Sequence, residues 1–216
     1  MKTIPTYVIN LKKRTDRKSH ILKEFAGRTE FYLHIIVVEE GEIAPIELWN
    51  TIKYILRNLV SPDEEYIIVC QDDHSFTEDY RKELLFKAII DAQKREAAIL
   101  MGGVSWFDTA LQISPDLFVV DKFSGSEFTV IFRKFFNTIL ETEFGPNDVF
   151  DYKISALTED KLVMYPFIST QKEFDCSNVR SKNNNEAYVV QMPSYSSATL
   201  KVLNDVALFY ELDVVK

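Results

Sequence analysis

The 216-residue sequence lacks the common nucleotide-binding signatures. It has neither a GxGxxG turn nor a GxxxxGK[ST] loop, so neither a dinucleotide fingerprint nor a P-loop is supported. No apolar run approaches the length of a membrane span, and the first residues lead into a predicted strand without the apolar core of a signal peptide. We therefore expect a cytoplasmic protein with at most peripheral membrane association.

Cysteine, histidine and positive charge are also scarce. The two cysteines, Cys70 and Cys176, lie far apart in the sequence, and we interpret both as reduced thiols. Only three histidines occur, which is a thin supply of ligands for a His-rich metal site. The formal net charge of −8 leaves no basic stripe to displace counterions from phosphates, so no nucleic-acid partner is expected.

Strand and helix patterns alternate along the first half of the chain. Apolar, β-branched runs predict strands at residues 4–11, 31–38, 66–70 and 97–101, with helices beginning near residues 15, 45 and 77. This rhythm predicts an α/β fold with a parallel sheet and right-handed crossovers. Further strands are expected within 105–120, at 127–132 and at 162–168, with short helices at 133–140 and 146–154, and with a polar loop at 175–185.

No repeat or linker divides the chain. We therefore expect one domain over residues 1–216. The oligomeric state is left open.

The strand at 66–70 ends in polar side chains. Asp72, Asp73 and His74 follow it directly, and ligands of open α/β sheets bind where strands reach their carboxyl edge. These groups could hold Mg²⁺ or Mn²⁺ carried in with a phosphate-bearing ligand. The alternative is ordinary turn chemistry, with Thr77 capping the next helix.

Basic residues follow the first strand. Lys12, Lys13, Arg14 and Arg17 would lie beside the acidic strand end, because the carboxyl edges of neighbouring parallel strands are adjacent. Arg17 is the most discriminating candidate, since a guanidinium makes charge-assisted, bidentate contacts with phosphates. A solvated basic helical turn is the alternative.

Two further carboxylates are candidate general bases. Asp148 and Asp151 are three residues apart, so one helical face could present both of them to an acceptor hydroxyl. Alternatively, both stabilise a helix N-terminus through its dipole. Gly125 is compatible with close backbone approach to a ligand or with a simple turn.

Three segments carry a resemblance to a known enzyme family. The first is similar to an opening INL..R.DR pattern and comprises Tyr7–Leu11, Arg14, Asp16 and Arg17. The second is similar to an EDD motif and comprises Val69–Phe76. The third is dispersed, with similarity to GT..Y, PVD and TQ, and comprises Gly125, Phe128, Val149–Asp151 and Ser169–Gln171.

In this order and spacing, across about residues 4–175, the set resembles the family 25 glycosyltransferases, which include lipopolysaccharide-biosynthesis enzymes. The resemblance implies a GT-A-like nucleotide-diphospho-sugar transferase fold, with a mostly parallel mixed sheet flanked by helices. It implies a nucleotide-binding half at about 1–103 and an acceptor-side half at about 104–216. It also implies a UDP-sugar donor, a glycan or lipopolysaccharide acceptor, and inverting transfer of a hexose, galactose or glucose.

Residue by residue, the resemblance implies that Asn10, Arg14 and Arg17 line the nucleotide site, with Gly125 nearby. It implies a divalent cation on Asp72 and Asp73. Asp151, which matches PVD, is the implied base, and Asp148 is its rival. Two departures stand out: Gln71 replaces the family's Glu, and His74 adds an imidazole.

Two other functions fit the same residues. One is a GT-A-like module that binds a nucleotide sugar or glycan without turnover. The other is a metal-dependent phosphohydrolase built on Asp72, Asp73 and His74, which would need more histidine and aspartate ligands at strand ends.

Overall fold

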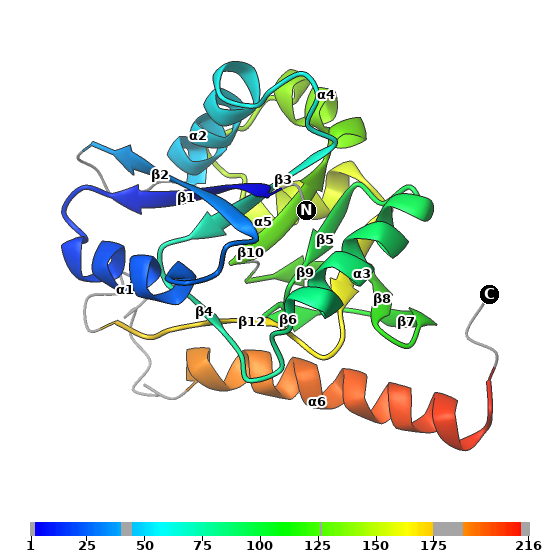
Figure 1. Ribbon diagram of the computed structural model, residues 1–216. Helices are drawn as coiled ribbons and strands as arrows, with labels where there is room; N and C mark the ends of the chain where they lie inside the picture. Colours follow the sequence, from blue (N-terminus) through cyan, green and yellow to red (C-terminus); the bar gives the residue numbers. More distant parts are fainter. Residues whose placement is uncertain (1–2, 40–44, 126, 175–187, 213–216) are drawn as a thin grey trace.

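The computed structural model describes residues 3–39, 45–125, 127–174 and 188–212 (Figure 1). Its elements, in chain order, are β1 Ile4–Leu11, α1 Thr15–Phe25, β2 Phe31–Val38, α2 Pro45–Asn58, β3 Tyr66–Gln71, β4 His74–Phe76, α3 Lys82–Lys94, β5 Ile99–Met101, β6 Trp106–Phe107, β7 Ala110–Ser114, β8 Leu117–Val120, β9 Phe123–Ser124, β10 Phe128–Phe132, α4 Arg133–Glu141, α5 Phe150–Leu157, β11 Lys161–Met164, β12 Ser169–Gln171 and α6 Tyr188–Phe209. Cys176 and the predicted loop at 175–185 lie outside these described residues.

One mixed sheet of eight strands organises the described chain, in the order β2-β1-β3-β10-β5-β11-β8-β7. β1 runs parallel to both β2 and β3, and β5 runs parallel to β11. β10 is antiparallel to its neighbours β3 and β5. The expected α/β class with a mixed sheet flanked by helices is confirmed, although the purely parallel rhythm predicted from the first half is interrupted by β10.

Helices cover both faces of the sheet (Figure 1). One core packs β-strand side chains against apolar residues of α2, α4, α5 and α6, including Trp49, Phe135, Ile154 and Leu200. The other packs the opposite face against α1 and α3, including Ile21 and Leu85. Strands buried on both faces explain the continuous apolar runs in the sequence.

The topology places a switch point between β1 and β3. After β1 the chain crosses through α1 to β2 on one side, and then through α2 to β3 on the other side. The carboxyl ends of β1 and β3 therefore diverge into opposite connections, which is where open α/β sheets bind ligands. Ile9 is in register with Gln71, so the residues that follow both strands are neighbours.

Two predicted helix starts differ from the structure. α3 begins at Lys82 rather than at Thr77, because residues 74–76 form β4 and pair with β12, and the Thr77 hydroxyl bonds the Phe167 carbonyl instead of capping a helix. α5 begins at Phe150 rather than at residue 146, because the Asp148 carboxylate accepts from the Gly145 N–H and closes a turn there.

The second half also differs in its last elements. The strand predicted at 162–168 is shorter, with β11 at Lys161–Met164 and a separate β12. α6, for which the sequence patterns predict no element, runs along the lower side of the molecule in Figure 1 and contacts β6, β7 and β12. Within the described ranges, no helix combines the length and apolar character needed to cross a membrane.

Candidate functional site

Arg17 joins two carboxylates at the end of β3. Its Nη1 atom lies 3.2 Å from Asp72 Oδ1 and 2.5 Å from Asp73 Oδ2. All three side chains are buried. The local backbone explains why both carboxylates reach one guanidinium: residues 72 and 73 form a turn between β3 and β4, so the alternation of an extended strand no longer applies. The predicted acidic strand end and basic helical turn thus meet.

β1 contributes Asn10 to the same cluster. Its Nδ2 donates to Asp72 Oδ2 at 2.8 Å and to the Arg14 carbonyl at 3.2 Å, so it ties the strand end to the first turn of α1. Arg14 Nη1 lies 3.8 Å from Asp72 Oδ1 with its side chain partly exposed. Of the other predicted basic residues, Lys12 pairs with Glu39 at the surface, and Lys13 is exposed.

Two buried oxygens of this cluster have no hydrogen-bond partner among the described residues. They are Asp73 Oδ1 and Asn10 Oδ1. Leaving a buried acceptor unsatisfied costs about 1–3 kcal/mol, so such atoms are rare without a reason. Both belong to residues at the switch point, which makes them candidate acceptors for a cation or for ligand N–H groups.

Opposing effects set the charge of Asp72. Burial raises the pKa of its carboxyl, and the neighbouring Asp73 charge raises it further, whereas the bonds from Asn10 and Arg17 lower it. The net direction is upward. For Asp72, burial and the Asp73 charge therefore outweigh the bonds from Asn10 and Arg17, and a perturbed carboxyl of this kind is typical of charged groups gathered at a functional site.

His74 is separated from this cluster by its surroundings. Its ring is 0% exposed, packs against Phe76 and Phe128, and lies with Nδ1 2.8 Å from Ser169 Oγ. Burial, followed by the nearby His20 and Arg28 charges, lowers its pKa to about 3, so the ring is neutral. The structure does not bring His74 into one ligand set with Asp72 and Asp73.

A divalent cation would have to use fewer protein ligands than predicted. Within the described ranges, no group of three or more His, Cys, Asp or Glu side chains is arranged to hold a metal ion. Asp72 and Asp73 remain a chemically suitable pair, because Mg²⁺ is often held by one or two carboxylates together with phosphate oxygens and water. The unpartnered Asp73 Oδ1 fits that use.

The two candidate bases occupy different settings. Asp151, in the first turn of α5, accepts the Gly125 N–H at Oδ2 over 2.7 Å. Gly125 has φ +72°, and a Cβ there would lie 2.1 Å from Ser105 Oγ, so glycine is required for this approach. Asp148 instead pairs with Lys153 at 2.8 Å and with the Gly145 N–H, contacts that lower its pKa.

The sequence analysis missed Glu127 as a functional candidate. It is buried at the start of β10, and its carbonyl accepts from the Gln71 N–H across the strand pair. Burial, then the Asp73 and Asp151 charges, raise its pKa to about 8, so it is largely protonated at neutral pH. The available signal was a lone carboxylate opening an otherwise apolar strand.

Gln171 completes the cluster from β12. Its Nε2 donates to Asp73 Oδ2 at 3.1 Å, and the Lys172 N–H donates to the Asp73 carbonyl at 2.7 Å. Phe174 then covers Arg17, whose Cζ lies 4.9 Å from the ring centroid. Two segments far apart in the sequence, α1 and the end of β12, therefore converge on Asp73.

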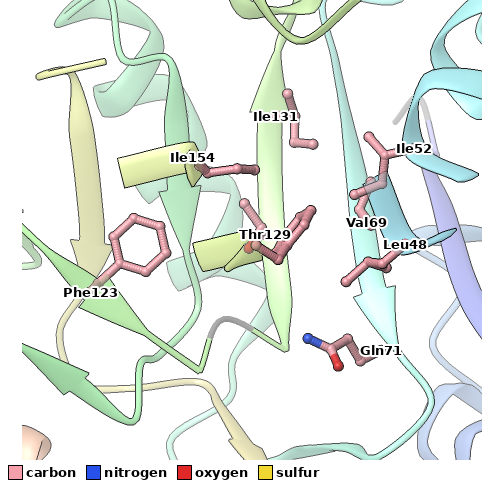
Figure 2. A pocket seen from close by; sticks show the side chains of 9 residues that line it. Leu48, Ile52, Val69, Gln71, Phe123, Thr129, Ile131 and Ile154 are labelled. Atoms are coloured by element: carbon pink, nitrogen blue, oxygen red, sulfur yellow. The ribbon is translucent and has the colours of Figure 1, made fainter. Parts of the chain in front are cut away.

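The cavity next to this cluster is too small for a nucleotide. It has a volume of about 20 Å³ and lies on the α2 and α5 side of the sheet. Figure 2 shows it lined mainly by apolar side chains such as Val69, Ile131 and Ile154, with the Gln71 amide at the end of β3. A space of this size holds about one water molecule.

Comparisons with known proteins bear on the fold. No family model matches the sequence, and a search of curated proteins gave no significant match. Among solved structures, the chain is similar to A197 from STIV, with 11% identity, 80% of this chain and 87% of that chain covered, and a TM-score of 0.53. At this identity the likeness concerns the fold alone.

Two UDP-glucose pyrophosphorylase structures are also similar. The one complexed with UDP-glucose has 13% identity, covers 90% of this chain and 81% of its own, and gives a TM-score of 0.48. The apo structure has 10% identity, with 91% of this chain and 82% of that chain covered, and a TM-score of 0.46. Likenesses below a TM-score of 0.5 support no functional conclusion, so the family 25 resemblance rests on the sequence motifs.

Proposed function

We propose that this chain is a glycosyltransferase that moves a hexose, galactose or glucose, from a UDP-sugar to a glycan or lipopolysaccharide hydroxyl with inversion. One observation carries the proposal: Arg17 pairs with Asp72 and Asp73 at the β1–β3 switch point, where buried acceptor oxygens of Asn10 and Asp73 have no partner in the part of the chain that the structure describes. An uncommitted polar cluster at this position is suited to a nucleotide diphosphate.

The nucleotide side of the site comprises Asn10, Arg14, Arg17 and Gly125. Arg14 is partly exposed and only weakly paired, so its guanidinium can turn to a phosphate oxygen at little cost. Arg17 is fixed by two carboxylates and by Phe174, so it provides a positioned positive charge instead. Preorganised charge of this kind stabilises a developing diphosphate leaving group.

Asp72 and Asp73 are the proposed ligands of Mn²⁺ or Mg²⁺. A cation bound there would neutralise the negative charge that builds on the leaving diphosphate. In the transfer, an acceptor hydroxyl oxygen forms the new bond to C1 as the bond from C1 to the UDP oxygen breaks. The bonding pair goes to the β-phosphate, and the hydroxyl proton goes to the Asp151 carboxylate.

Paired variants test this assignment. Asp73→Asn and Asp151→Asn should each lower turnover by about 10²–10³-fold in a UDP-release assay, because each removes a group acting on charge or proton in the transition state. Asp148→Asn is the matched control and should stay within a few-fold, since its carboxylate is held by Lys153 and Gly145. If Asp148→Asn abolished turnover while Asp151→Asn remained active, the base would be Asp148 rather than Asp151.

A non-catalytic binding module is the second candidate. It is favoured by the pairing of Asp72 and Asp73 with Arg17, and by the lack of a three-ligand metal group within the described residues. Calorimetry with UDP and Mn²⁺, alongside a donor-hydrolysis assay, separates the two. Binding without any product would favour the module over the enzyme.

A further inference from the structure

A second pocket borders α5 on the side away from Arg17's helix. It measures about 510 Å³, within the usual range for small-molecule sites. One face of α5 lines it through Tyr152 and Ser155, and Glu159 lies just beyond the end of this helix. Trp106 of β6 and the loop residues Asp121 and Lys122 close the other side.

Aromatic surface is left open at this pocket. Trp106 is 38% exposed and Tyr152 is 52% exposed, although both are large side chains that proteins usually bury. Two aromatic residues beside a pocket present flat apolar surface to a ligand. A pyranose ring has an apolar face of C–H groups that would cover such a surface.

The charged groups of the pocket favour a neutral, hydroxyl-rich ligand. Asp121 and Glu159 supply acceptors for hydroxyl protons, and Lys122 supplies donors. Carboxylates outnumber the ammonium, which disfavours a phosphate or another anion. Aromatic surface together with both kinds of hydrogen-bonding group therefore matches a saccharide better than a nucleotide.

The pocket adjoins the proposed base. Trp106 pairs across the β6–β9 ribbon with Ser124, whose neighbour Gly125 donates its N–H to Asp151. Asp151 precedes Tyr152 in α5 and lies one helical turn before the pocket residue Ser155. A sugar seated between Trp106 and Tyr152 would thus lie next to the proton acceptor.

We propose that this pocket binds the pyranoside ring of the acceptor glycan and presents its hydroxyl to Asp151. The proposal deepens the proposed function and rests on it for the acceptor role. Trp106 and Tyr152 are acceptor-binding residues in this account, and neither contacts the Arg17–Asp72–Asp73 cluster through any interaction described above.

Fluorine NMR of protein labelled with 5-fluorotryptophan tests the proposal directly. The chain has two tryptophans, and Trp49 is 1% exposed in the core, so it serves as an internal control. Trp106→Phe assigns the two resonances. Titration with methyl β-D-galactopyranoside, methyl β-D-glucopyranoside and lactose should move the Trp106 resonance saturably and leave that of Trp49 in place.

Variants sharpen the result. Tyr152→Ala should weaken the saccharide-induced shift at least several-fold, whereas Tyr54→Ala, an equally exposed tyrosine on α2, should leave it unchanged. No saturable movement of Trp106 with any of the three saccharides would overturn the proposal. Equal movement of Trp49, equal movement with glycerol, or an unchanged response in Tyr152→Ala would overturn it as well.

Calorimetry with UDP and Mn²⁺ distinguishes this failure from failure of the proposed function. UDP binding without any saccharide response would reject the pocket and leave the donor site standing. A saccharide response without UDP binding would keep the glycan pocket but reject its acceptor role together with the proposed function. For an acceptor site, Tyr152→Ala should raise the acceptor KM while UDP affinity stays unchanged.

Discussion

Arg17 is the residue of the candidate site that pairs with both buried carboxyl groups, Asp72 and Asp73. Two buried carboxylates depend on one guanidinium, and a buried charge without a partner is strongly unfavourable. The same arrangement holds the Asp72 and Asp73 carboxyl groups close together around one guanidinium, a geometry that a cation or a polar ligand can use. Stability and ligand binding are thus coupled at this residue.

Replacing Arg17 should expose that dependence. Arg17→Leu should lower the free energy of unfolding by about 3–5 kcal/mol at pH 7, because it removes the guanidinium that pairs with both Asp72 and Asp73. The loss should shrink at low pH, where protonation discharges the carboxylates. Urea unfolding at pH 7 and at low pH measures this loss of stability, and Lys18→Leu, at an exposed position of the same helix, is the control. Equal losses for the two variants would contradict the prediction.

Glu127 should make stability fall as pH rises. Its folded pKa of about 8 lies above the ordinary value of 4.5, so its contribution is full below pH 4.5 and is lost as pH rises through 8. Glu127→Gln should therefore stabilise the protein at pH 8 and above and change little near pH 4.5. Each unit of pKa shift corresponds to about 1.4 kcal/mol. Thermal melts from pH 4.5 to 9 test it, and parallel curves for the two proteins would refute it.

Residue patterns predicted part of the candidate site. Polar groups directly after β1 and β3 were identifiable because strand ends meet at one sheet edge, and the structure brings Asn10, Arg17, Asp72 and Asp73 together there. His74 was misleading, because β4 turns its ring into an aromatic cluster. Glu127 was missed because its position depends on β10 pairing antiparallel with β3, which no local pattern encodes.

Among the elements, the two long neighbouring strands β1 and β2 were the most predictable. β1 and β2 have the predicted bounds because β-branched residues fill them and α1 separates them at a short distance. β4 was not predicted, since its partner β12 is about a hundred residues away in the sequence, and a helix was expected from Thr77 onward. Long-range pairing outweighs local preference in such short strands.

α6 was not predicted because its apolar residues do not form one stripe. Leu200 is buried in the sheet core, whereas Val202, Val206 and Phe209 are exposed. Polar contacts also hold the helix, including Ser196 Oγ to the Ser105 carbonyl at 2.8 Å. Pro193 lies inside it, a residue that sequence rules place at helix breaks.

One buried side chain should account for much of the attachment of α6. Leu200→Ala should cost about 2–5 kcal/mol of unfolding free energy by opening a cavity under the helix. The matched control is Val202→Ala, two residues further along the same helix, where the side chain is 61% exposed. It should change the free energy of unfolding by less than about 0.5 kcal/mol. Denaturant melts of both variants measure the difference. Similar effects would mean that α6 is not docked through Leu200.

At the scale of the whole molecule, positive charge is concentrated locally. The chain carries a net charge of −8, yet the guanidinium groups of Arg14 and Arg17 both lie at Asp72. Such local grouping attracts a small anion without making the surface attractive to a nucleic acid. The charge distribution is therefore consistent with a nucleotide diphosphate as the ligand at the switch point.

Ligand binding at the switch point should stabilise the entire fold. UDP with Mn²⁺ at a hundred times its dissociation constant adds about 2.7 kcal/mol, which for a chain of this size raises Tm by about 5–10 °C. Asp73→Asn should remove most of that increase, whereas Asp148→Asn, outside the cluster, should keep it. Differential scanning fluorimetry with UDP, GDP and ADP in parallel measures both effects. Because a general anion site would respond to all three diphosphates alike, equal shifts would reject a uridine-specific donor site, and no shift with any of them would reject a nucleotide site altogether.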